Sequence, residues 1–259
     1  MRKLWISFAM LFVAAVAVGA TLDETYDRTF DVRPGALFAL ENTNGRITIR
    51  SWDQPRVRVI GHKRVESRDS DAARQGMAAL RIEASPSAGG LRVTTLYPHK
   101  SDGFFDWLAG NHVSMSVEYD VTVPRIMDLN VDNTNGAIDI SDVRGTLQVS
   151  DTNGHIELVR CAGSVEAETT NGAVRAELTE VTAGKSMRLE TTNGRITVTV
   201  PRSIAARLDA STTNGSISTE LPVTMSSTSR HALRGTINGG GGGELRLRTT
   251  NGSIDIRAR

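Results

Sequence analysis

Seven short segments of the chain share one alternation of apolar and polar residues around a Thr-Asn-Gly triplet. Apolar residues stand five and three positions before the threonine and, in most segments, two and four positions after the glycine, as in the segment 147–158. An alternation with a period of two is typical of a strand that is buried on one face. Each segment is therefore predicted to form a strand, a corner and a second strand.

The triplets recur at intervals of 91, 18, 18, 22, 21 and 37 residues. Four of the six intervals lie between 18 and 22 residues, which is the size of one coil of a β-solenoid. The expected corner residues are Asn44, Gly45, Asn135, Gly136, Asn153, Gly154, Asn171, Gly172, Asn193, Gly194, Asn214, Gly215, Asn251 and Gly252. Glycine or asparagine is expected at these corners because both tolerate a positive φ.

Asn-Gly is also a hairpin signal, so a meander of hairpins is the competing interpretation. A meander does not need the same three residues at every turn, whereas a solenoid stacks equivalent positions about 4.8 Å apart and lets asparagines hydrogen-bond as a ladder. The predicted fold is all-β, a single-stranded parallel β-helix (β-solenoid), and the crossover rule for parallel strands makes it right-handed. We expect Glu166, Arg188, Asp209 and Arg246 to form one outward column of alternating charge on successive coils.

The long first interval indicates an insertion over residues 51–124 that covers one end of the stack. Alternation predicts strands at 56–60, 91–96 and 113–123, and helical spacing predicts a helix at 69–84, so the insertion is expected to be a small β-α-β-β cap. Near the other end, residues 230–237 are expected to add a strand before a glycine-rich loop.

The N-terminus has the pattern of an export signal. A short basic start precedes an uncharged, mostly apolar run that ends Val18-Gly19-Ala20, which predicts a signal peptide at 1–20 and a mature domain at 21–259. An uncleaved anchor is the alternative, although the run is short for a membrane span. The mature chain has no second long apolar stretch, so we expect it to have no membrane span and to lie in the periplasm, outside the cell or at the cell surface.

Composition narrows the functional classes. The formal net charge of the chain is +1, and charged residues make up 23%. A nucleic-acid binder would show a basic face, so no nucleic-acid partner is expected. The single cysteine, Cys161, excludes an intramolecular disulfide; we expect a small structural residue there, with an intermolecular disulfide as the alternative.

Parallel β-helices include enzymes that cleave polysaccharides, so outward carboxylates on neighbouring coils are the candidate catalytic groups. Asp139 and Glu157 are predicted to lie on neighbouring coils near His155 and Arg175. Two adjacent carboxyl groups can serve as acid and base, but Arg175 beside Glu157 would neutralise it. We predict no catalytic residues.

Metal binding has a weaker signal. His99 and His112 flank a loop that also carries Asp102 and Asp106, but no histidines stand at the i, i+4 spacing and no cysteine accompanies them. We expect neither a metal nor a cofactor.

The loop 97–112 carries the aromatic residues Tyr97, Phe104, Phe105 and Trp107. Exposed aromatic rings can stack on sugars or anchor a protein partner, which makes these four the candidate ligand-binding residues. The alternative, which we favour, is that they fold back and cover the apolar end of the solenoid.

The repeated Thr-Asn-Gly-x-Ile, together with segments 40–47, 119–124 and 235–240, resembles the bacterial putative-adhesin family of β-strand-repeat proteins over residues 29–257. The resemblance implies an exported parallel β-helix with no established catalytic residues. It favours a non-enzymatic binding or adhesion module whose partner is a protein or a cell-surface glycan. Two alternatives stay open: a polysaccharide lyase or hydrolase, and a periplasmic structural or envelope-stress accessory.

Overall fold

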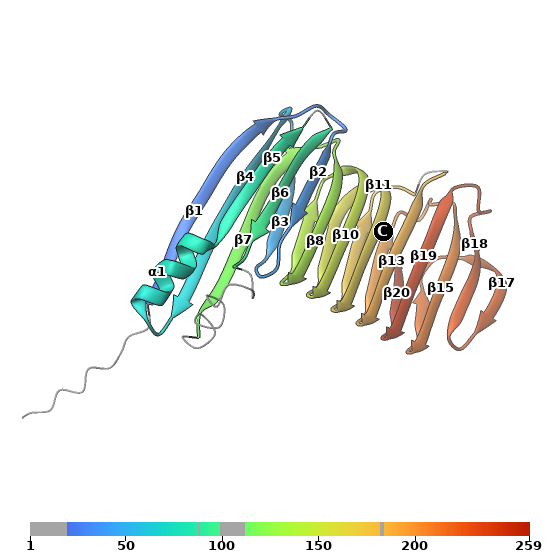
Figure 1. Cartoon of the computed structure of the whole chain (residues 1–259). Helices are drawn as coiled ribbons and strands as arrows, with labels where there is room; N and C mark the ends of the chain where they lie inside the picture. Colours follow the sequence, from blue (N-terminus) through green and yellow to red (C-terminus); the bar gives the residue numbers. More distant parts are fainter. Residues whose placement is uncertain (1–19, 88, 99–111, 182–183) are drawn as a thin grey trace, which may run out of the picture.

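The computed structural model describes residues 20–87, 89–98, 112–181 and 184–259 (Figure 1). The described chain is almost entirely β-structure, with one helix, α1 (Ser70–Ala79). Its strands form two sheets: sheet B contains the strands that precede the Thr-Asn-Gly corners, and sheet A contains the strands that follow them.

Sheet B consists, in spatial order, of β5 (Arg81–Ser87), β6 (Gly90–Leu96), β2 (Leu37–Glu41), β8 (Asp128–Asn135), β10 (Arg144–Asn153), β11 (Ile156–Asn171), β13 (Ser186–Asn193), β19 (Gly243–Asn251), β15 (Ala206–Asn214), β18 (Ala232–Ile237) and β17 (Val223–Ser229). Sheet A consists of β1 (Ala20–Asp31), β4 (Arg56–Ser67), β7 (Ser114–Pro124), β3 (Ile47–Trp52), β9 (Ile138–Ser141), the first part of β11, β12 (Val174–Leu178), β14 (Ile196–Val200), β20 (Ile254–Ala258) and β16 (Ile217–Thr219).

Coils that carry a corner pair with one another in parallel and in register. Leu147, for example, lies beside Leu129 on one side and Val165 on the other, and these three residues occupy the same place in their repeats. The strands on the two sides of a corner pair with neighbouring coils and not with each other, so the hairpin interpretation is wrong. The alternation seen in the sequence therefore places every aliphatic column between the two sheets.

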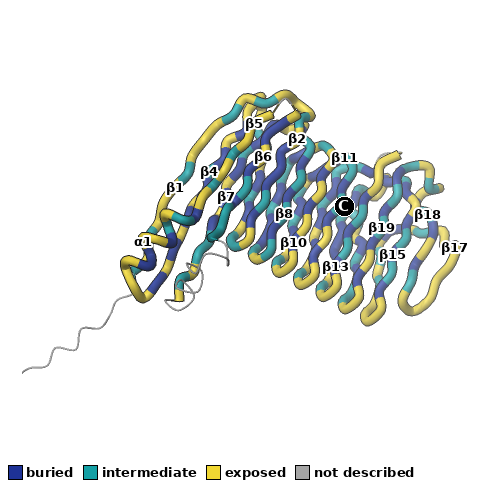
Figure 2. Tube along the Cα trace, viewed as in Figure 1, coloured by how far each residue is buried: buried dark blue, intermediate teal, exposed yellow. Residues whose placement is uncertain are grey.

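The space between the sheets holds one continuous apolar core. The inward aliphatic residues of both sheets are buried and belong to a single cluster, which Figure 2 shows as dark blue bands along the coils. Burying a leucine or isoleucine side chain contributes about 1.5–3 kcal/mol, so the repeated inward positions supply most of the driving force for stacking.

The coils do not stack in chain order throughout. β19 and β20 lie between the coil of β13 and β14 and the coil of β15 and β16, although they come last in the sequence (Figure 1). The expected succession of coils is therefore wrong at this end. The segment 238–242, with four glycines, lets the chain return to this gap.

The reason for glycine at the corners also differs from the expected one. Only Gly45 and Gly136 among the corner glycines have a positive φ. What all seven share is a close approach to the preceding layer: a Cβ built on Gly172 would lie 1.9 Å from the carbonyl oxygen of Gly154. Any side chain there would push adjacent coils apart, so the packing of corner on corner requires glycine.

One inward position next to each corner is polar and buried. It is filled by Asn42, Asn133, Asp151, Thr169, Thr191, Thr249 and Thr212. The threonines hydrogen-bond to the glycine carbonyl of the adjacent corner, as Thr169 does to Gly154 at 3.0 Å. These bonds satisfy carbonyl groups that the tight corner removes from water.

The N-terminal end is covered by more structure than the repeat pattern indicates. The predicted helix at 69–84 is too long: α1 ends at Ala79, and β5 begins at Arg81. The helical spacing of Leu80 and Ala84 caused the error. β1 was not expected, since Leu22, Tyr26 and Phe30 recur only every four residues.

β1 pairs antiparallel with β4 and is held by cross-strand ion pairs. Asp23 contacts Arg64 at 2.8 Å and Asp27 contacts Arg58 at 2.6 Å. At the other end, the expected strand at 230–237 is observed as β18, which forms a hairpin with the unpredicted β17. Both ends thus finish in antiparallel strands that cover the parallel stack.

The corner geometry yields a stability prediction. Gly172→Ala should lower the free energy of unfolding by about 3 kcal/mol, because the new methyl group collides with backbone atoms that cannot move without separating two coils. The matched control is Gly241→Ala, since a Cβ at Gly241 meets no atom within 4 Å. Chemical denaturation of both variants checks the claim, and equal stabilities would contradict it.

Candidate functional site

The outer face of sheet B carries a series of depressions over β10, β11, β13, β19, β15, β18 and β17, and three of them are connected. Four of them have volumes of about 310, 340, 310 and 580 Å³. Adjacent depressions share lining residues, including Ser186, Arg207, Glu244 and Arg246. We call this surface the sheet B groove. It is shallow and open, so it suits an extended ligand better than a small enclosed one.

Charged side chains from neighbouring coils form the floor of the groove. Arg188 on β13 contacts Glu166 on β11 at 3.2 Å and Glu190 on its own strand at 3.1 Å. The pKa of Arg188 is raised, mainly by the hydrogen bond with Glu166 and secondly by the charge of Glu190. Arg188 therefore remains a fixed positive charge in the middle of the groove.

The inserted C-terminal coil changes the expected charge column. Because β19 lies between β13 and β15, Arg246 is the register partner of both Arg188 and Asp209, and two arginines stand side by side. The expected order Glu166, Arg188, Asp209, Arg246 is therefore wrong. Carboxylates two residues along each strand offset the repulsion, since Glu190 contacts Arg188 and Glu244 contacts Arg246 at 2.9 Å.

One nitrogen in this network is buried without a hydrogen bond. The Nε of Arg246 is buried and has no hydrogen-bond partner among the described residues. A buried donor without a partner is costly, so this arginine is under strain in the folded protein. The sequence gives no signal for this feature, because it depends on which coil lies beside β19.

Hydroxyl groups surround the charged floor on the side of the corners. The second depression is lined by Glu168, Glu190 and Arg248 together with Ser211 and threonines of four coils. The exposed members of this set include Thr192, Thr213 and Thr250, the first residues of their triplets. The groove thus combines both signs of charge with many neutral donors and acceptors.

The corner asparagines form a ladder along the edge of the groove. Six of the seven side-chain amides donate to the asparagine of the adjacent coil, from Asn135 to Asn44 at 2.7 Å through to Asn214 to Asn251 at 2.8 Å. Asn251 stands between Asn193 and Asn214, in agreement with the position of β19. The amides are thereby engaged with one another, and they serve the stacking of the coils.

Of the four candidate aromatic residues, only Tyr97 lies within the described chain. Its hydroxyl donates to Asn42 Oδ1 at 3.2 Å and accepts from the backbone amide of Asn44 at 3.2 Å. Burial raises the pKa of Tyr97 to about 12. Tyr97 therefore closes the N-terminal end of the ladder, whereas Phe104, Phe105 and Trp107 lie outside the described residues.

Of the four candidate metal ligands, His112 is the one within the described chain. His99, Asp102 and Asp106 lie outside the described residues, and His112 is exposed. Among residues 20–98, 112–181 and 184–259, apart from residue 88, no group of three or more His, Cys, Asp or Glu side chains is arranged to hold a metal ion.

The candidate acid–base residues lie on the outer face of sheet A. Asp139 and Glu157 are register partners and line a depression of about 400 Å³ with His155. Asp139 contacts Arg46 at 3.4 Å and His155 at 3.9 Å, and Glu157 contacts Arg175 at 3.8 Å. Each carboxylate thus faces a basic group on an open surface, as in ordinary surface ion pairs.

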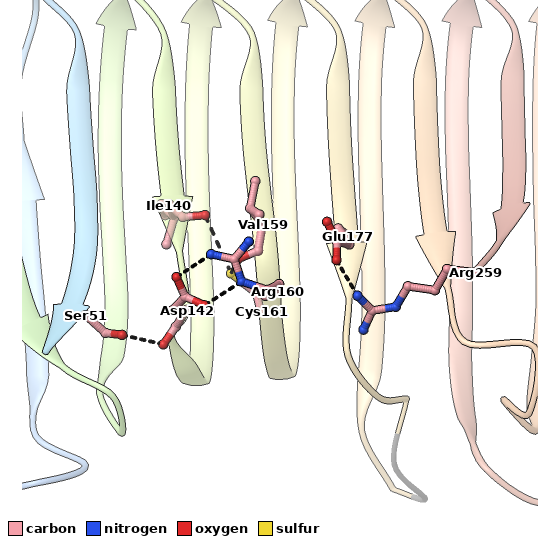
Figure 3. Close-up of polar contacts among 8 residues, drawn as sticks. All are labelled: Ser51, Ile140, Asp142, Val159, Arg160, Cys161, Glu177 and Arg259. Atoms are coloured by element: carbon pink, nitrogen blue, oxygen red, sulfur yellow. Dashed lines mark hydrogen bonds and ion pairs between the residues drawn. The ribbon is translucent and has the colours of Figure 1, made fainter. Parts of the chain in front are cut away.

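Cys161 lies in β11, at the point where this strand passes from sheet A to sheet B (Figure 3). Its thiol is buried, near the carbonyl of Ile140 at 3.8 Å, and burial raises its pKa to about 11. Beside it, Arg160 donates two hydrogen bonds of 2.7 and 2.6 Å to the carboxylate of Asp142. These bonds hold the pKa of that carboxyl below its usual range. A buried, protonated thiol is a packing residue and a poor partner for an intermolecular disulfide.

The charge network of the groove can be tested through stability. Glu190→Gln should lower the free energy of unfolding by about 0.5–1 kcal/mol, because Arg188 and Arg246 then face each other with one carboxylate fewer. The loss should shrink at high salt, where the repulsion is screened. Glu157→Gln on sheet A is the control, and an equal loss in both variants, independent of salt, would contradict the assignment.

Comparison with known proteins places this architecture in a family. Residues 39–257 match the Toastrack DUF4097 family. Among solved structures, the chain is similar to a putative cell adhesion protein from Clostridium sporogenes ATCC 15579 (12% identity, TM-score 0.44, 91% of this chain and 100% of that chain). It is also similar to a putative adhesin from Bacteroides fragilis NCTC 9343 (13% identity, TM-score 0.35, 90% and 97% of the two chains). No curated protein matches the sequence. Since the family match spans most of the chain and includes the repeated corners, this protein belongs to the Toastrack DUF4097 family.

Proposed function

We propose that this protein is a non-enzymatic, exported binding module of the adhesin type, and that it binds an extended, polar ligand in the sheet B groove. The observation that carries the proposal is the series of three connected depressions across seven strands of one sheet face, with a fourth beside them. A ligand that spans several coils would contact equivalent side chains repeatedly, and many modest contacts would add to useful affinity.

The chemistry of the groove favours a glycan as that ligand. Hydroxyl-rich walls and paired charges offer donors and acceptors at short intervals, which suits the hydroxyl, carboxylate and amide groups of cell-surface polysaccharides. The floor is not strongly charged in one sign, because Glu166, Glu190 and Glu244 accompany Arg188 and Arg246. A purely electrostatic partner such as nucleic acid is therefore a poor fit.

A binding role is supported over a catalytic one by the way the carboxylates are used. Glycoside hydrolysis needs two carboxyl groups on opposite sides of the scissile bond, one of them protonated. In the groove, Glu166 and Glu190 both contact the same arginine. On sheet A, Asp139 and Glu157 each have a basic partner of their own.

Export remains part of the proposal. Residues 1–20 are proposed to be a cleaved signal peptide, and residues 21–259 a single domain with an insertion at 51–124 and a right-handed coil. β1 begins at Ala20, so cleavage after this residue would remove only the first residue of the strand and leave Thr21–Asp31 paired with β4. No helix in the described ranges is long and apolar enough to cross a membrane.

Ligand binding can be tested with a polysaccharide array probed by the labelled mature protein. The double variant Arg188→Ser/Arg246→Ser should lose at least about tenfold of the signal from any polysaccharide bound by the wild type. The control Arg175→Ser/Arg195→Ser removes two arginines from sheet A and should keep it. Equal losses in both double variants, with native circular dichroism, would contradict binding in the groove.

The same wild-type incubations test the enzymatic alternative. New reducing ends or unsaturated products, lost in Asp139→Asn/Glu157→Gln, would show a polysaccharide-cleaving enzyme and overturn the proposal. Cell fractionation with surface protease treatment separates the third function: a protein confined to the periplasm would be an envelope accessory and not an adhesin.

A further inference from the structure

The polar inward column beside the corners shows a rule with one exception. At six of its seven positions the side chain has an N–H or O–H that donates to a backbone carbonyl of an adjacent layer. Four threonines donate to glycine carbonyls, Asn133 donates to Gly45 at 3.2 Å, and Asn42 donates to Val117 at 3.0 Å. The seventh position is Asp151, whose ionised side chain has no hydrogen to donate.

The side chain of Asp151 is buried beside its corner. Its residue is 6% exposed, and both carboxylate oxygens are buried without a hydrogen bond among the described residues. The backbone amides of Thr152 and Asn153 favour the ionised carboxylate, but the desolvation penalty of burial outweighs them. The fold therefore needs something at this corner besides the bare carboxylate.

The geometry shows what is missing. A Cβ built on Gly154 would lie 2.2 Å from Oδ2 of Asp151 and 2.1 Å from the carbonyl oxygen of Gly136. The two oxygens thus approach the same small space from two coils. In the next coil the equivalent space is bridged by a hydroxyl hydrogen, since Thr169 donates to Gly154 at 3.0 Å.

We infer that Asp151 takes up a proton in the folded protein as the pH falls and, as a neutral carboxylic acid, donates that proton to the carbonyl oxygen of Gly136, so that the Asn153 corner is a proton-binding site that tightens in acid. The protonated carboxyl then does what a threonine hydroxyl does at four other corners. A cation is the competing occupant, because Oδ1 of the neighbouring Asn133 is also unpartnered. The space favours the proton, since even a Cβ on Gly154 would meet three atoms within 2.7 Å.

The surroundings of Asp151 fit this assignment. Its inward neighbours on β8 and β11 are Asn133 and Thr169, and the residues turned into the core after the corners are Ile138 and Ile156, all uncharged. Glu168 and Asp132, one position away in register, belong to the outer face of the sheet. His155 is the charged residue that acts on the carboxyl, and it lies 3.9 Å from Asp139.

Burial is the largest influence and raises the pKa of Asp151 to about 6, against the backbone amides of Thr152 and Asn153 and the charge of His155, which lower it. The usual value is 3.8. The folded state thus binds the proton more tightly than the unfolded chain does. The contribution to stability is complete below about pH 4 and is lost as the pH rises through about 6.

The experiment measures unfolding by denaturant between about pH 4 and pH 7 for the wild type, Asp151→Asn and Asp151→Thr. Both replacements carry a permanent donor to Gly136. We expect the unfolding equilibrium constant of the wild type to rise about fiftyfold from pH 4 to pH 7 relative to either variant. The variants should accordingly be the more stable proteins near pH 7. Asp31→Asn, which alters an exposed aspartate, should leave the wild-type profile unchanged.

The carboxyl ¹³C resonance of Asp151 gives a reading that does not depend on unfolding. A midpoint near 6 supports the inference, and a higher midpoint in His155→Gln supports the assignment of the opposing charge. A midpoint at or below the usual value of 3.8, or a wild-type pH profile in Asp151→Asn, would overturn it. If Ca²⁺ or Na⁺ stabilises the wild type near pH 7 but does not stabilise Asp151→Asn, the site binds a cation and the inference is overturned.

Discussion

The contact of one glycine corner with the next is the constraint on which the rest of this structure depends. The carbonyl oxygen of each corner lies where a Cβ of the adjacent corner would be, so the coils reach their hydrogen-bonding distance only if the position is glycine. Once the corners are stacked, the register of the strands on both sides is fixed. The asparagine ladder, the aliphatic columns and the polar inward column then follow, because each consists of equivalent residues brought into line by the same contact.

Stacking in register has a cost as well as a benefit, because it aligns whatever the sequence places at equivalent positions. Where the residues are aliphatic, alignment produces the core. Where they are charged, it can bring like charges together, as for Arg188 and Arg246, and carboxylates on the same strands compensate. The sheet B groove is a product of this arrangement: its charged floor and hydroxyl walls are outward columns of several coils, and the inserted β19 supplies Glu244 and Arg246 to its centre.

The Asp151 corner shows the effect of in-register stacking on a single hydrogen bond. A tight corner removes a glycine carbonyl from water, and some neighbour must donate to it. Threonine and asparagine donate at any pH, whereas an aspartate donates only when protonated. A repeat that appears uniform in its backbone can therefore contain one coil whose packing responds to acidity. The groove and this corner lie in the same stack, and binding would be measured on a scaffold whose stability depends on pH.

Much of this protein follows from local patterns in its sequence. The period-two alternation and the seven Thr-Asn-Gly triplets determine the strands, the corners, the contents of the core and the family, because each depends on residues only a few positions apart. The neighbourhood of Asp139 and Glu157 follows equally, since those coils are consecutive. The position of β19 between β13 and β15 does not, because all corners offer nearly the same contact and the sequence does not rank one neighbour above another. Only the closed tertiary structure, with a glycine-rich segment long enough to return to the gap, decides that Arg246 meets Arg188, and the binding face depends on that choice. β1 and β5 were missed for a related reason. The apolar residues of β1 recur every four positions, and Ala84 of β5 stands four positions after Leu80 at the end of α1, so only pairing with β4 and β6 shows that both are strands.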